Sequence, residues 1–158
     1  MDYDIAYTID NLKFFAGATR LIEGVAAKEY VPDGTSMLRR EPVGVVAAIT
    51  PWNYPLMVVG WRAIPAIAAG NTVVVKPASY TPLTALELAG TIKKVGIPKG
   101  VFNVVTGSGS AVGEELARND KVDMIAFTGS NEVGKRISNL ASDSVKRLSL
   151  KLGGKPRS

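Results

Sequence analysis

Short apolar runs, each followed by a polar or glycine-containing turn and then by a helical pattern, repeat through the sequence after residue 42. They cover residues 43–49, 72–75, 101–105 and 122–127, and residues 145–152 are the candidate for a fifth strand. Each run is long enough for one buried strand and too short for most helices. The repetition predicts an α/β fold with a Rossmann-like, doubly wound parallel sheet, in which right-handed crossovers bring all strand-end loops to one edge.

The first run ends in a loop that two prolines stiffen, reading TPWNYP from Thr50 to Pro55. Because proline lacks a ladder donor, the strand stops at Pro51, and Trp52 and Asn53 are expected on a tight loop. Ligands bind at this edge of open α/β sheets, which makes Asn53 a candidate functional residue. The alternative is a proline-rich turn in which Trp52 packs in the core and Asn53 caps the next helix.

Two polar residues follow the second run, Lys76 and Ser79. The Lys76 ammonium suits ribose hydroxyls or a phosphate, although a lysine with its stem along the surface is the alternative. A carboxylate at position 79 would favour a free ribose 2′-hydroxyl and repel a 2′-phosphate. Serine removes that repulsion, so a cofactor that carries a 2′-phosphate is also admissible.

Glycine turns follow the third and fourth runs, at Gly107 and Gly129. Gly129 lets backbone approach a ligand closely, and the helix after Ser130 offers unpaired N–H groups to a phosphate or pyrophosphate. Neither turn matches the G-x-G-x-x-G fingerprint, and the chain has no G-x-x-x-x-G-K-[ST] phosphate loop. Plain strand–helix turns are therefore the alternative.

The N-terminal part differs from the rest. Apolar residues at three- and four-residue steps predict a helix over residues 3–27. The segment after it, with a Pro32-Asp33-Gly34 turn signal, is predicted to be a connector with a short extended piece around Ser36–Arg40. The predicted organisation is an N-terminal helix at 1–28, a connector at 29–42 and a binding domain at 43–158.

Composition excludes several classes of protein. The 158 residues contain no cysteine and no histidine, which excludes a disulfide framework, a Cys/His metal site and a Ser-His-Asp triad within this chain. The net charge of +5 is dispersed rather than gathered into one stripe, so we expect no nucleic-acid partner; a basic nucleic-acid-associated protein is the remaining alternative on charge alone. No apolar run spans a membrane and the start is acidic, so we expect a cytoplasmic protein.

Five motifs occur in family order along nearly the whole chain: EPVGVVAAITPWNYPL, AIPAIAAGNTVVVKPASYTPLTA, GVFNVVTGSG, AFTGSNEVGK and LKLGGK. With them the sequence closely resembles the aldehyde dehydrogenase superfamily, and most of all its group that acts on betaine aldehyde and aminoaldehydes. The resemblance implies part of the aldehyde dehydrogenase fold, NAD(P)-dependent oxidation of an aldehyde to a carboxylic acid, and a homo-oligomer in the complete enzyme.

The resemblance also implies roles for individual residues. Asn53 matches the asparagine that supports the oxyanion. Lys76 and Ser79 match the adenosine-ribose pair. The other positions that match cofactor-binding residues of the family are Ile49, Thr50, Pro51, Trp52, Gly107, Phe127, Gly129, Ser130, Val133 and Leu152.

Two departures from the family concern catalysis. The family uses a cysteine thiolate to attack the aldehyde, passes a hydride to the nicotinamide, and hydrolyses the thioester with water that a Glu activates. Here Lys151 stands at the position of that Glu, and the chain has no cysteine. A protonated amine cannot accept a proton from water.

We therefore expect a fragment that carries most of a cofactor domain and binds a nicotinamide dinucleotide. This fragment would meet an aldehyde substrate only as part of a complete enzyme, and we expect it to be inactive alone. The alternative is a non-catalytic dinucleotide-binding module or a partner of a full-length dehydrogenase.

Overall fold

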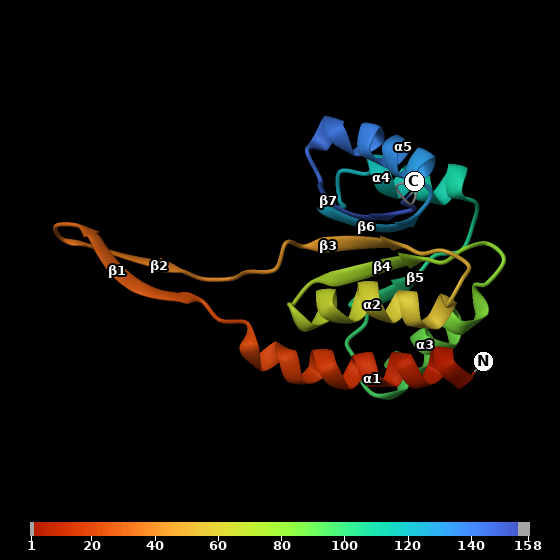
Figure 1. Cartoon of the computed structure of the whole chain (residues 1–158), viewed down its shortest axis with the longest axis horizontal. Helices are drawn as coiled ribbons and strands as arrows, with labels where there is room; N and C mark the ends of the chain where they lie inside the picture. Colours follow the sequence, from red (N-terminus) through yellow and green to blue (C-terminus); the bar gives the residue numbers. More distant parts are fainter. Residues whose placement is uncertain (1, 155–158) are drawn as a thin grey trace.

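Five parallel strands form the central sheet. The computed structural model describes residues 2–154, and the strands lie in the order β5-β4-β3-β6-β7 (Figure 1). Their bounds are β3 Val45–Ile49, β4 Thr72–Lys76, β5 Phe102–Val104, β6 Met124–Gly129 and β7 Arg147–Leu152. The chain moves outward from β3 through β4 to β5, then returns to the other side of β3. This is the doubly wound arrangement that the sequence predicts, and it has a switch point between β3 and β6.

Helices cover both faces of the sheet (Figure 1). On one face lie α2 (Pro55–Ala68) and α3 (Leu83–Lys94), with α1 (Asp2–Ala18) outside them. On the other face lie α4 (Glu114–Arg118), which follows a π-helical turn at Gly109–Gly113, and α5 (Asn131–Ala141). No helix among residues 2–154 combines the length and the apolar character that crossing a bilayer requires.

Each face of β3 contributes to a separate apolar core. Val46 and Ala48 pack with residues of α2 and β4, whereas Ala47 and Ile49 pack with residues of α4, β6 and α5. A strand that is buried on both faces has no polar alternation, which explains the continuous apolar run in the sequence.

The prediction for the N-terminal part is wrong in its second half. The helix ends at Ala18, a 3₁₀ turn follows at Thr19–Leu21, and β1 (Val25–Val31) and β2 (Gly34–Leu38) form an antiparallel hairpin that projects away from the sheet (Figure 1). The segment predicted as helix end and connector is therefore largely strand. Nearly all residues of β2 are exposed, so apolar and polar residues do not alternate along it. That alternation is the pattern by which a half-buried strand is recognised in a sequence. The Pro32-Asp33-Gly34 turn signal was correct, with Asp33 at φ 67°.

The face of α1 that packs on α2 is not the apolar stripe expected from the sequence. Ile5 and Ile9 are each 47% exposed, whereas Thr8 is buried against Gly60 of α2. The carboxylate of Asp4 accepts hydrogen bonds from the backbone N–H groups of Leu56 and Met57, at 3.1 and 2.9 Å. One turn of α1 thus caps the start of α2, because those N–H groups have no partner within their own helix.

Replacing Asp4 by Ala is expected to lower the free energy of unfolding by about 1 kcal/mol, since two N–H groups of α2 lose their acceptor. The measurement is urea unfolding of the purified chain. Asp10→Ala is the matched control, because it removes the same charge from α1 at an exposed position. Equal midpoints for the two variants would contradict the capping role of Asp4.

Candidate functional site

Three residues that the sequence singled out lie level with one another where the central strands end. In the sheet register Ile49 of β3 pairs with Lys76 of β4 on one side and with Phe127 of β6 on the other. The loops that follow these strands therefore start side by side at the switch point. In open α/β sheets this crevice is the usual position for a ligand.

The loop after β3 leaves two side chains in solvent. Trp52 is 67% exposed and Asn53 is also exposed, so the alternative of a core tryptophan is wrong. No side chain of this loop caps α2; Asp4 does so instead. Thr50 is 4% exposed and its N–H donates to the Lys76 carbonyl at 3.1 Å. Its Oγ1 is buried and has no hydrogen-bond partner among the described residues.

Lys76 is a buried cation, with 4% of its surface exposed. Its Nζ donates to the Pro77 carbonyl at 2.9 Å. Burial lowers the pKa of the ammonium below its usual value. An ammonium has three donors, so two are available beyond the bond to Pro77. The alternative of a surface lysine is thereby excluded, and the two remaining donors lie at the end of β4.

The loops after β4 and β5 are joined by Ser79 and Gly107. The Ser79 hydroxyl donates to the Gly107 carbonyl at 3.0 Å. Gly107 has φ 151°, a conformation that side chains rarely adopt, and the Val112 side chain fills the place of its missing Cβ. Two candidates 28 residues apart in sequence are therefore in direct contact.

The turn after β6 leads directly into α5. The Ser130 hydroxyl accepts a hydrogen bond from the Val133 N–H at 3.3 Å and so caps the helix. Gly129 cannot carry a side chain without meeting the Phe127 ring, and a Cβ on Gly134 would meet Leu152. The N–H groups of the first turn and the positive end of the helix dipole face the edge where Gly129 lies, which suits an anion.

A cavity of about 190 Å³ opens beside this turn, between α5 and the π-helical turn before α4. Its lining residues are Ile49, Gly109, Ser110, Gly113, Glu114, Val133, Arg136 and Ile137. Only Ile49 and Val133 were candidates from the sequence. The sequence does contain one sign of this cavity, the spacing Gly107-x-Gly109-x-x-x-Gly113. Glycines at these positions leave room beside the helix that follows.

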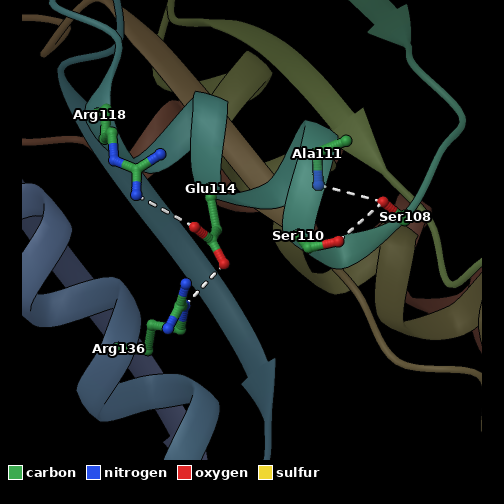
Figure 2. Close-up of polar contacts among 6 residues, drawn as sticks. All are labelled: Ser108, Ser110, Ala111, Glu114, Arg118 and Arg136. Carbon is green, nitrogen blue, oxygen red and sulfur yellow. Dashed lines mark hydrogen bonds and ion pairs between the residues drawn. The ribbon is translucent and has the colours of Figure 1, made fainter.

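Beside this cavity, Glu114 forms ion pairs with two arginines, Arg118 and Arg136 (Figure 2). Its Oε1 accepts from Arg136 Nε at 2.6 Å and its Oε2 accepts from the Arg118 guanidinium at 3.1 Å. The hydrogen bond from Arg136 and the two nearby positive charges lower the pKa of the Glu114 carboxyl, against the opposing effect of its burial. The carboxylate is thus ionised at neutral pH.

A second cation, Arg62 of α2, was missed by the sequence reasoning. Its guanidinium donates to Thr128 Oγ1 at 2.7 Å and to Ser149 Oγ at 3.3 Å, and so connects α2 to β6 and β7. Burial lowers the pKa of Arg62. The sequence did mark this residue, because Arg62 is the single charged residue in the otherwise apolar helix sequence PLMVVGWRAIPAIA.

Two further candidates lie on β7, where Lys151 pairs with Thr128 and Leu152 pairs with Gly129, and Pro51 is partly buried in the loop after β3. Lys151 is exposed, whereas Leu152 packs against Gly134. A larger hollow of about 780 Å³ lies at the opposite edge of the sheet, lined by charges of both signs such as Arg39, Asp123 and Lys146. It contains none of the candidates. Residues 2–154 hold no cluster of three or more side chains suited to a metal ion.

The sequence matches a family model described as "Aldehyde dehydrogenase family" over residues 1–157. Similar relatives include betaine aldehyde dehydrogenase of Bacillus subtilis, 48% identical over 90% of this chain and 29% of the relative. Human cytosolic 10-formyltetrahydrofolate dehydrogenase is also 48% identical, over 96% of this chain and 17% of the relative. The resemblance to this family, with a betaine aldehyde dehydrogenase among its similar members, is confirmed.

Solved structures of aldehyde dehydrogenases superpose closely on this chain. An NAD-dependent aldehyde dehydrogenase from Sinorhizobium meliloti superposes with a TM-score of 0.93 at 45% identity, covering 96% of this chain and 30% of that one. Betaine aldehyde dehydrogenase from Staphylococcus aureus, solved in complex with NAD⁺, superposes with a TM-score of 0.93 at 39% identity and the same coverage. The expected partial aldehyde dehydrogenase fold is confirmed, and the chain spans about 30% of the length of these two structures.

Proposed function

The chain belongs to the aldehyde dehydrogenase family, and we propose that it binds the nicotinamide dinucleotide of an NAD(P)-dependent enzyme that oxidises an aldehyde to a carboxylic acid. The observation that carries this proposal is the level placement of Ile49, Lys76 and Phe127 at the switch point of the sheet. The proposed binding unit is residues 43–158, and the helix α1 and the β1–β2 hairpin precede it. Met1 and residues 155–158 lie outside the described part. A cytoplasmic location and a homo-oligomer stay predictions.

The residues at the strand ends fit a dinucleotide in three ways. The start of α5 offers free N–H groups to a pyrophosphate, and Gly129 allows its close approach. Lys76 keeps unused donors for ribose hydroxyls. The buried Thr50 Oγ1 has no partner among the described residues, so a ligand group can supply one. Beside them, Ile49, Pro51, Trp52, Phe127, Val133 and Leu152 supply apolar surface in this proposal.

Asn53 is the residue of this chain that we place next to the reacting aldehyde. Its amide N–H would donate to the aldehyde oxygen as negative charge develops there, and such a donor is typically worth about 3 kcal/mol. The bound nicotinamide supplies hydride acceptance. Lys151 stands where the family has its general base, and a protonated ammonium has no lone pair with which to take a proton from water.

The direct test is calorimetric titration of the purified 158-residue chain with NAD. We expect saturable binding, and no aldehyde-dependent formation of NADH, because the chain contains no cysteine to supply a thiolate. A folded chain that binds neither NAD nor NADP would overturn the binding proposal. Measurable turnover would overturn the proposal that the chain by itself is inactive.

Ser130→Asp separates helix capping from anion binding. Asp and Asn cap helices about as well as Ser, so stability should stay within about 0.5 kcal/mol for Ser130→Asp and for the neutral control Ser130→Asn. The added carboxylate would repel a pyrophosphate at the same helix end, so NAD affinity should fall about tenfold or more in Ser130→Asp alone. Unfolding in urea and NAD titration measure the two effects. Equal NAD affinity of the Asp and Asn variants would place the pyrophosphate elsewhere.

Ser79 is expected to permit both forms of the coenzyme. Ser79→Glu should weaken NADP binding about tenfold or more and leave NAD binding within about threefold, because a carboxylate repels a 2′-phosphate and accepts from a 2′-hydroxyl. Ser79→Gln has nearly the same size without the charge and should retain NADP. Parallel calorimetric titrations of the variants with NAD and with NADP measure both affinities. If Glu and Gln affect NADP equally, charge at this position does not govern the choice.

A further inference from the structure

The carboxylate of Glu114 is held in one position beside the cavity. Arg136 and Arg118 each bind one of its two oxygens, and these bonds come from α5 and from the next turn of α4 (Figure 2). The Glu114 side chain is only 14% exposed, whereas both arginine side chains are more than half exposed. A carboxylate oxygen accepts about two hydrogen bonds, so each oxygen of Glu114 retains room for another donor.

The cavity beside Glu114 is otherwise apolar and narrow. Five of its eight lining residues are apolar or glycine, and the polar ones are Ser110, Glu114 and Arg136. Its volume is about 190 Å³. An apolar cavity of about 150 Å³ accepts benzene, so this one suits a flat heteroaromatic ring. Because Ile49 forms one wall, the cavity adjoins the strand ends at which we place the dinucleotide.

We propose that Glu114 selects the purine base of the coenzyme by accepting a hydrogen bond from the 6-amino group of adenine. The inference rests on the proposed function and deepens it. Adenine presents a donor at position 6, which pairs with a carboxylate that can only accept. Hypoxanthine presents a carbonyl oxygen at the same position, and two acceptors then face each other without a proton between them. Arg136 is a positioning residue, because it fixes Glu114 from the opposite helix.

The Glu114 network also joins α4 to α5, so a purely structural role needs a separate control. Arg118 provides it. Arg118 bonds to the same carboxylate, yet it does not line the cavity. Loss of Arg118 therefore weakens the network and leaves the proposed contact with the base in place.

The experiment compares NAD with nicotinamide hypoxanthine dinucleotide, which differs only at the purine, by calorimetric titration of the full chain. Wild-type protein should bind NAD about tenfold more tightly, as expected for one hydrogen bond to a charged group. Glu114→Gln should reduce this ratio to about twofold or less, because an amide can also donate. Arg118→Gln should keep the wild-type ratio.

Equal affinity of the wild-type chain for the two dinucleotides would overturn the selection by Glu114 and leave the proposed function standing. Binding of neither dinucleotide would overturn both. A tenfold ratio that persists in a Glu114→Gln variant with the wild-type circular dichroism spectrum would also overturn it. If Glu114→Gln does not fold, the wild-type ratio decides alone: tenfold supports the proposal and a ratio near one rejects it.

Discussion

The parallel register of β3 with its two neighbours is the constraint on which the site depends. Backbone hydrogen bonds set Ile49 level with Lys76 and with Phe127, and they do so without any contribution from a ligand. A shift of one residue in either pairing would turn every side chain of that strand to the opposite face and exchange the two cores. The positions of the loops are therefore fixed by the same bonds that hold the apolar strands together.

A buried lysine and a partly buried arginine give this edge its electrostatic character. The hydrogen bonds of Lys76 and Arg62 in the described part of the chain go to hydroxyl and carbonyl oxygens. The ion pairs described for residues 2–154 include neither of them. A buried cation without a carboxylate partner destabilises the fold, and it also favours an anion nearby. The positive end of the α5 dipole adds to the same field.

The sequence predicted the sheet well and the site in part. Apolar runs such as residues 72–75 reveal buried strands because burial on both faces leaves a continuous signal. Candidates at strand ends, including Lys76 and Gly129, follow from topology once the strands are placed. Arg62 and Glu114 could not be found in this way, because each acts through partners distant in sequence or on another helix, at positions set by packing angles. Strand β1 was missed and β2 was found only as a short extended piece, because exposed strands carry no apolar periodicity.

The loop after β3 shows what the fold accepts in order to present Asn53. Tyr54 adopts a left-handed conformation, φ 48° and ψ 56°, which costs a residue with a Cβ about 1 kcal/mol or more. Proline on either side, at Pro51 and Pro55, narrows the other conformations open to this loop in the unfolded chain. Asp4 holds the first N–H groups of the helix that begins there. Contacts outside the loop thus offset the strain, and the amide of Asn53 is left exposed, as the proposed role of a hydrogen-bond donor to the aldehyde requires.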